Sequence, residues 1–358
     1  MNMTNNLVSI IIVNYNGKNY LKNCIESILK NNYNNCEIWV VDNNSKDGSI
    51  NMVNDEFRNV PNLHLIKLSN NKGPAYARNI GARRARGKII GFLDNDTEVD
   101  VNWITKAVKY FQNDSSIGIL QCKLLMVENK KQFDYAGEYL SSLGFLVHRA
   151  YHREKDKGQF DNPAEILAAK SAGMFIRRDV FEKINGFDED YFIFMEETDL
   201  GWRTWLAGYR VIFAYDSIVF HHFSITKKIV KPSFNNYLVR FHGTKNYILT
   251  LYKNLSLKNL IFILPKNIFL WLGLAAYLCM RGNFSSSKNI MKGTFWNITH
   301  FPQTLRKRKK VQKTRKISDK NLFKKICKKR SVYSYVKQFL SAQKQLVTPE
   351  NQNGYSVI

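Results

Sequence analysis

The chain has 358 residues, of which 44% are hydrophobic and 13% aromatic, a composition that excludes a disordered chain and permits a sizeable core. Its formal net charge of +25 at pH 7 favours anionic partners, such as nucleic acid, a membrane surface or phosphorylated substrates. The five cysteines form no CxxC pair, which argues against a cysteine-bound metal and favours a reducing compartment.

The first hundred residues alternate between predicted strands and predicted helices. The apolar run that begins at Leu7 has no cationic segment before it, so we expect a strand there rather than a signal peptide. Strands are predicted at residues 7–14, 36–42, 62–68 and 88–94, and helices at 18–30, around Ile50 and Val53, and at 73–85. This order predicts an α/β fold with right-handed βαβ units and a largely parallel sheet.

Polar residues stand where three of these strands end. Asn14, Asp42 and Asp94 each close a predicted strand. Ligands of open parallel sheets bind at the carboxyl ends of the strands. We therefore expect these three side chains to converge on one crevice.

The stretch KIIGFLDNDTEVD runs from an apolar strand straight into four acids. They are Asp94, Asp96, Glu98 and Asp100. Carboxylates at this density repel one another, and a divalent cation such as Mg²⁺ would relieve the repulsion. An acidic loop without an ion is the alternative, because Asp-x-Asp is a common triplet.

The second half of the chain is mixed. A helix is predicted at residues 196–208, a strand at 209–223 and further helix at 232–256. The apolar segment Leu260–Met280 is interrupted at Pro265, and the remaining 268–280 is shorter than the roughly 20 residues that cross a bilayer. It predicts a helix in the membrane interface, with a buried core helix as the alternative.

The positive charge is concentrated near the end of the chain. Residues 306–330 carry fourteen Lys and Arg against one acid, Asp319. We therefore expect three parts: a catalytic domain of residues 1–225, a helical membrane-interface segment of residues 226–300, and a basic tail of residues 301–358.

Seven motifs follow one another between Val8 and Phe223. They are VSIIIVNYNG, VVDNNSKDGS, NKGPAYARNIG, FLDND, AGMFIRRDVFEKINGFDEDYF, EETDLGWR and VFHH. With these motifs the chain resembles the inverting glycosyltransferases of family two, which have the GT-A fold. It is most similar to the branch of rhamnosyl- and galactofuranosyl-transferases.

The resemblance implies roles for individual residues. The nucleoside-diphosphate sugar would be bound by Asn14, Asn16, Asp42, Asn44, Arg78, Asn79 and Asp94. Asp96 and His221 would hold Mg²⁺ or Mn²⁺, with His222 as the reserve for His221. The alternative role for Asp42 is to form a turn. The alternative for Arg78 is a structural position on a solvated helix face. Residues 134–149 resemble the acceptor side of the family, and no roles are assigned within them.

The general base is expected among three acids at the start of one helix. Glu196, Glu197 and Asp199 stand in Glu-Glu-Thr-Asp-Leu, where the family commonly has Glu-Asp-x-Asp-Leu. Glu197 takes the place of the usual Asp and is the favoured base; the other two would orient the acceptor or the helix. Acids in a first turn are also favoured by the helix dipole alone.

The expected function is metal-assisted transfer of a sugar to a hydroxyl of a lipid-linked or cell-surface glycan, at the cytoplasmic side of the cell membrane. The interface helix and the basic tail predict a peripheral or monotopic enzyme on an anionic membrane surface. A processive synthase is disfavoured because the chain has no Gln-x-x-Arg-Trp motif. The alternatives are a basic nucleic-acid-binding protein and a non-catalytic nucleotide-sugar-binding protein; an oxidoreductase is disfavoured because no GxGxxG follows the first strand.

Overall fold

The computed structural model describes residues 6–151, 153–222 and 236–328. The chain divides into two compact units. The first unit comprises Met1–Gly137, Arg149–Phe223 and Lys313–Ile317, and the second unit comprises Glu138–His148, Ser224–Gln312 and Ser318–Ile358. The boundary expected at residue 225 lies outside the described residues, and the sequence does not reveal that 138–148 belongs to the second unit.

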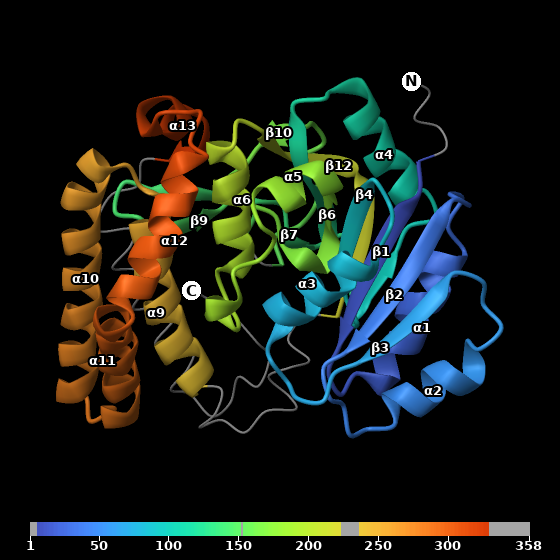
Figure 1. Cartoon of the computed structure of the whole chain (residues 1–358), viewed down its shortest axis with the longest axis horizontal. Helices are drawn as coiled ribbons and strands as arrows, with labels where there is room; N and C mark the ends of the chain where they lie inside the picture. The colour runs from blue at the N-terminus through green and yellow to red at the C-terminus, as the bar shows by residue number, and fades with distance from the viewer. Residues whose placement is uncertain (1–5, 152, 223–235, 329–358) are drawn as a thin grey trace. The chain divides into compact units, whose positions relative to one another are not determined.

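The first unit is built on a ten-stranded sheet (Figure 1). Its strands are β1 (Val8–Asn14), β2 (Cys36–Asp42), β3 (Leu63–Lys67), β4 (Ile89–Asp94), β5 (Thr97–Val99), β6 (Ile117–Met126), β7 (Phe133–Tyr135), β10 (Ala164–Glu165), β11 (Met174–Arg177) and β12 (Arg210–His221). The main path has the order β10-β12-β6-β11-β4-β1-β2-β3, in which β4, β1, β2 and β3 are parallel. The antiparallel β11 separates β4 from β6. The prediction of an α/β fold with a mostly parallel sheet is confirmed.

Helices cover both faces of this sheet. They are α1 (Lys18–Leu29), α2 (Ser49–Glu56), α3 (Pro74–Arg84), α4 (Trp103–Asn113), α5 (Arg178–Lys183) and α6 (Glu196–Leu206), with short 3-10 turns at Ser171–Gly173 and Glu189–Tyr191. Alternate residues of β1, such as Ile10 and Ile12, share one core with apolar residues of α1 and α4. Ile11 faces the opposite side, where α3 packs so closely that a Cβ added to Gly81 would lie 2.5 Å from its Cγ2.

The parallel strands bring their carboxyl ends to one edge of the sheet. Asn14 pairs in register with Asp42, and Val13 pairs with Asp94. Because β1 is central and fully buried, its neighbours cannot slip without exposing apolar side chains. The register therefore fixes the three polar strand ends beside one another.

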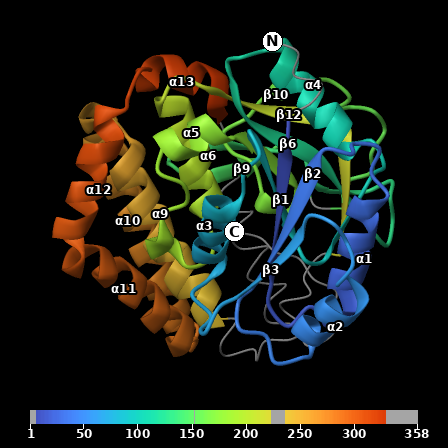
Figure 2. The same ribbon diagram turned by 45° about the vertical axis from the view of Figure 1, so that its right-hand side comes forward.

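The second unit consists of helices and a small sheet (Figure 2). A π-helical turn, Leu238–His242, leads into α9 (Gly243–Asn254), and α10 (Leu257–Met280), α11 (Phe284–Thr299), α12 (Phe301–Lys313) and α13 (Asp319–Ile326) follow. The sheet pairs β8 (Glu138–Ser141) with β9 (Leu146–His148) and β13 (Cys327–Lys328). Residues 301–328, expected as part of a tail, are thus mostly helical, and the rest of that tail lies outside the described residues.

Helix α10 corrects one expectation. It is a single helix of 24 residues that continues through Pro265, so the interruption expected at Pro265 is wrong. Pro265 has no N–H to donate to the carbonyl of Ile261, and both residues lie on an exposed side of the helix. By length and composition alone, α10 could cross a membrane, although a third of its most apolar window is buried within the protein.

Candidate active site

Hydrogen bonds between side chains tie together the ends of β1, β2 and β4. The amide nitrogen of Asn14 donates to Asp42 Oδ1 at 2.8 Å and to Ser45 Oγ at 3.1 Å. The amide oxygen of Asn14 accepts from Asn95 Nδ2 at 2.7 Å. Asn95 is the central residue of the Asp-Asn-Asp triplet, so this network links the Asp42 end of the sheet to the acidic run. Sequence reasoning gave Asn95 no role.

The loops after β1 and β2 are shaped by their own polar side chains. Asn16 and Asn44 have left-handed φ angles of 51° and 68°. Asn16 Oδ1 accepts from the Lys46 amide at 2.8 Å, and Asp42 Oδ2 accepts from the Ser45 amide at 2.9 Å. Turn formation is therefore a real role of Asp42, and the donor-binding roles of Asn16, Asp42 and Asn44 stay predictions.

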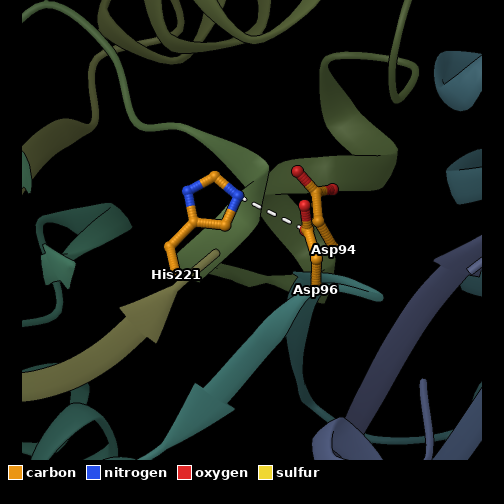
Figure 3. A group of neighbouring side chains, drawn as sticks. All are labelled: Asp94, Asp96 and His221. Atoms are coloured by element: carbon orange, nitrogen blue, oxygen red, sulfur yellow. Dashed lines mark ion pairs between the residues drawn. The ribbon is translucent and has the colours of Figure 1, made fainter. Parts of the chain in front are cut away.

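Asp94, Asp96 and His221 form a cluster of potential metal ligands. One ligand atom from each lies within 4.8 Å of the others, and His221 Nε2 lies 3.3 Å from Asp96 Oδ1. Figure 3 shows the three side chains pointing toward one another. Pairing of β5 with β12 places His221 opposite Thr97 and thereby beside Asp96. Two carboxylates and one imidazole fit a divalent cation, and this mixed oxygen and nitrogen set suits Mn²⁺ well.

Behind His221 lies Asp134, which sequence reasoning did not identify. His221 Nδ1 is 2.9 Å from Asp134 Oδ2. Burial alone would lower the pKa of His221, but the Asp96 and Asp134 carboxylates outweigh it and raise that pKa well above its usual value. Asp134 is the first residue of the stretch 134–149, which resembles the acceptor side of the family. This resemblance is the only feature of the sequence that points to Asp134.

Arg78 connects the acidic run to helix α6. Its guanidinium lies 2.9 Å from Asp94 Oδ1 and 3.1 Å from Glu196 Oε1, and Glu197 Oε1 is 4.0 Å away. Burial would lower the pKa of Arg78, but the surrounding carboxylates raise it. This arginine is therefore buried among acids rather than solvated, and its contact with the donor remains a prediction.

The three acids of α6 have different environments. The side chain of Asp199 is fully buried and pairs with Arg203 at 2.7 Å, while that of Glu196 is 4% exposed and pairs with Arg78. The Glu197 side chain is 21% exposed and accepts from Ser171 Oγ at 2.6 Å. Only Glu197 combines a fixed position with access for a substrate. Ser171 is a further residue that the sequence did not indicate.

Asn79 has a different set of partners. Its side chain donates to the carbonyl of Phe187 and to Glu189 Oε1, both at 2.9 Å, and accepts from the amide of Phe187 at 2.9 Å. Close packing supports this contact, because a Cβ added to Gly186 would lie 2.7 Å from Asn79 Oδ1. Asn79 thus anchors the segment that leads into α6, and its donor-binding role stays a prediction.

The turn before α6 is strained. Phe192, Phe194 and Met195 have φ angles of 61°, 67° and 67°. Left-handed backbone costs a residue with a side chain on the order of 1–2 kcal/mol. Gly73 makes room for this turn, because a Cβ there would lie 2.5 Å from the carbonyl oxygen of Phe192. Surrounding packing, rather than local preference, holds the first turn of α6.

We expect Asp199→Asn to destabilise the protein by about 3 kcal/mol, because it leaves the buried Arg203 guanidinium without its counter-charge. Urea denaturation of the variant and the wild type measures the change. Asp179→Asn, at an exposed acid in the first turn of α5, is the control and should be nearly neutral. An unfolding free energy within experimental error of wild type would contradict a structural role for Asp199.

Glu196→Gln should change how stability depends on pH. Burial, together with repulsion from Glu197 and after part of the effect is offset by Arg78, raises the pKa of Glu196 to about 8. A carboxyl whose pKa is higher in the folded state binds its proton more tightly there, so wild type loses stability as the pH rises from about 4.5 to about 8. The variant lacks this loss. As the pH rises through this range, the free energy of unfolding should fall for wild type relative to the variant. Parallel curves of unfolding free energy against pH would contradict the raised pKa of Glu196.

Comparison with known proteins agrees with this geometry. The family model described as Glycosyl transferase family 2 matches residues 9–184. The O-antigen biosynthesis protein RfbC of Myxococcus xanthus is 28% identical over 230 residues, which are 62% of this chain and 18% of RfbC. Residues 9–184 therefore belong to glycosyl transferase family 2. The chain spans less than a fifth of the length of RfbC.

Solved structures show that the chain has the GT-A fold. The S. aureus TarS 1–349 complex with UDP-GlcNAc has a TM-score of 0.56 at 16% identity, covering 86% of this chain and 88% of TarS 1–349. The mannosyltransferase PcManGT from Pyrobaculum calidifontis, in complex with GDP-Man and Mn²⁺, has a TM-score of 0.50 at 17% identity, covering 86% and 85%. The rhamnosyl- and galactofuranosyl-transferase branch is not established by these likenesses.

Proposed function

We propose that this family-two glycosyltransferase moves a sugar, with inversion, from a nucleoside diphosphate to a hydroxyl of a lipid-linked or cell-surface glycan. One observation carries the proposal: a continuous set of side chains joins the Asp94–Asp96–His221 cluster through Arg78 to Glu197. Asn14 and Asn95 extend the same set to Asp42. Donor, metal and base functions would thus share one edge of the sheet.

The known proteins support a nucleotide-sugar donor. TarS is described with UDP-GlcNAc and PcManGT with GDP-Man and Mn²⁺, and RfbC takes part in O-antigen biosynthesis. Within this chain, Asn14 and Asp42 would face the nucleotide at the strand ends, where open sheets bind ligands. The resemblance of the stretch VVDNNSKDGS to the family favours a rhamnose or galactofuranose donor linked to deoxythymidine or uridine diphosphate, and another hexose is the alternative.

The mechanism follows from the positions of the acids. Asp94, Asp96 and His221 would hold Mn²⁺ or Mg²⁺, which when bound supplies positive charge opposite the departing diphosphate. Glu197 accepts the proton of the acceptor hydroxyl as the hydroxyl oxygen attacks the anomeric carbon. The oxygen attacks from the side opposite the leaving group, so the configuration at the anomeric carbon is inverted. The hydrogen bond from Ser171 keeps the Glu197 carboxylate in place.

The acceptor is proposed to lie at the cytoplasmic side of the membrane. The apolar helix α10 and the basic residues that follow it support a peripheral or monotopic enzyme. A lipid-linked glycan acceptor would then be held in the same membrane as the enzyme.

A panel of nucleoside-diphosphate sugars tests the proposal. With Mn²⁺ or Mg²⁺ present, at least one member should raise the melting temperature and be hydrolysed slowly to free nucleoside diphosphate. EDTA should abolish the hydrolysis. If no member binds in the presence of either metal, the proposed function is wrong.

A further inference from the structure

Helix α10 is apolar on both of its faces. Its inner face is buried and includes Leu260, Trp271, Leu274 and Leu278. Its outer face carries exposed apolar residues at helical spacing: Leu257, Ile261, Phe262, Phe269, Leu272, Tyr277 and Met280. An amphipathic helix of a water-soluble protein would carry polar residues on that outer face. The outer face of α10 therefore has the chemistry of a surface that is covered in use.

Helix α11 adds a second apolar stripe next to it. Phe284, Met291, Phe295 and Ile298 are exposed, with Lys288 on the same stripe. The two helices are joined by a short turn and pack against each other within the second unit (Figure 2). Twelve of the sixteen large exposed hydrophobic residues in the described part of the chain lie between Leu257 and Phe301. Isolated exposed apolar residues are ordinary, whereas a concentration of this kind marks a binding surface.

The charge of this region indicates what covers it. The sequence has no Asp or Glu between residues 217 and 318, a stretch that carries nineteen Lys and Arg. Exposed lysines such as Lys258, Lys266 and Lys292 stand among the apolar residues, and their long side chains can place the ammonium at phosphate level while the stem lies on apolar surface. A second copy of the chain would bring the same cations face to face. An anionic bilayer complements both the apolar residues and the charge.

The inner face of α10 determines how the helix lies. Asn267 is fully buried and donates to the carbonyl of Leu143, and Trp271 lies against the rings of Phe145 and Tyr247. A membrane-spanning α10 would have to break these contacts and expose the Asn267 amide to lipid, at considerable cost. The packed inner face therefore favours a helix that stays on the protein and lies along the membrane.

We propose that the outer faces of α10 and α11 form a lipid-binding surface that enters the headgroup boundary of an anionic bilayer, with α10 in the plane of the membrane. This deepens the membrane-bound acceptor of the proposed function, but its test requires neither donor nor acceptor.

Binding of the full chain to vesicles tests the surface. Wild type should co-sediment with vesicles of phosphatidylcholine and phosphatidylglycerol, and much less with phosphatidylcholine alone. Phe269→Ser and Phe295→Ser remove side chains that are 74% and 62% exposed, and each should weaken binding roughly tenfold. Leu29→Ser, at an exposed apolar residue of the first unit, is the matched control and should bind as wild type does.

Three results would overturn the proposal. Unchanged vesicle binding by the double variant Phe269→Ser/Phe295→Ser would show that the lipid contact lies elsewhere; if the same variant converts a dimer to a monomer in sedimentation, the surface is an interface between copies. Resistance of bound wild type to extraction at alkaline pH would show that α10 spans the bilayer. Because vesicle binding is measured without sugar nucleotide, a failure here leaves the glycosyltransferase proposal standing.

A separate observation assigns a role to Asp134. Its side chain is 1% exposed, and its Oδ2 lies 2.9 Å from His221 Nδ1, while His221 Nε2 is turned toward Asp96. Histidines that bind metals commonly donate their second ring nitrogen to a carboxylate, which fixes the tautomer and the ring orientation. We infer that Asp134 is a positioning residue that keeps the Nε2 lone pair of His221 available to the metal. This inference rests on the proposed metal site.

Manganese affinity tests this role without an activity assay. Free Mn²⁺, measured by its electron paramagnetic resonance signal, should show binding to Asp134→Asn that is 10 to 100 times weaker than binding to wild type. Asp134→Glu keeps the charge and should fall between the two, and it serves as the test if the asparagine variant does not fold. Asp216→Asn removes the same charge from β12, the strand that carries His221, and should bind Mn²⁺ as wild type does. Wild-type affinity in folded Asp134 variants would refute the inference, whereas no Mn²⁺ binding by wild type would instead refute the metal site.

Discussion

Asp96→Asn is expected to lower the rate of sugar transfer by about a thousandfold, the loss typical of removing one group that stabilises charge in the transition state. Asp96 is buried, belongs to the ligand cluster and is the member that lies 3.3 Å from His221. Asparagine keeps the size of the side chain but removes its charge. Release of nucleoside diphosphate at saturating donor and Mn²⁺ measures the effect, and the melting temperature establishes that the variant is folded.

A neighbouring acid supplies the control for Asp96. Glu98 belongs to the same acidic run, but it pairs with His222 at 3.5 Å and is not a member of the ligand cluster. Glu98→Gln should therefore keep its transfer rate within a few fold of wild type. Wild-type turnover by Asp96→Asn would remove Asp96 from the mechanism, and equal losses in both variants would show that the acidic run acts only through its total charge.

Glu197→Gln is expected to lower kcat by a factor of about 10² to 10⁴, the range for loss of a general base. Glutamine can still accept the hydrogen bond from Ser171, so the side chain should stay in place while losing the ability to take up a proton. The KM for the donor should change little, because Glu197 acts on the acceptor. Steady-state kinetics measures both constants.

Glu182→Gln is the matched control for Glu197. Glu182 lies on α5, has a side chain that is 65% exposed and pairs only loosely with Arg178 at 3.6 Å. Its replacement should leave kcat unchanged. If Glu197→Gln keeps wild-type activity while Glu196→Gln loses it, the base is Glu196, and the greater exposure of Glu197 is not the deciding property.

The sequence predicted the strand ends of the site because parallel pairing leaves little freedom there. Once 7–14, 36–42 and 88–94 are recognised as buried strands, their polar ends must meet at one edge, and Asn14 does pair in register with Asp42. His221 was placed near the acids by the resemblance alone. In the structure, the pairing of β5 with β12 supplies the physical reason.

Other parts of the site depend on contacts that no local pattern reveals. Asp134 and Ser171 reach His221 and Glu197 from segments distant in the sequence, and neither stands in a motif typical of its role. Asp199 is an acid that could serve as a general base, but only the structure shows that its carboxylate is paired with Arg203. Pro265 suggested a break because proline disfavours helix interiors, whereas packing of the inner face of α10 maintains the helix through it.

At the turn formed by Phe192, Phe194 and Met195, a change that stabilises the protein would also disturb the alignment of the catalytic side chains. Glycine at Phe194 or Met195 would relieve the left-handed backbone strain, and it would also release the first turn of α6 from its imposed direction. Selection for a more stable protein would therefore favour substitutions at this turn. These substitutions would misalign the carboxylate of Glu197, which accepts the proton. A thermostable version of this enzyme is better sought at surface positions far from residues 192–195, where gains in melting temperature carry no penalty in turnover.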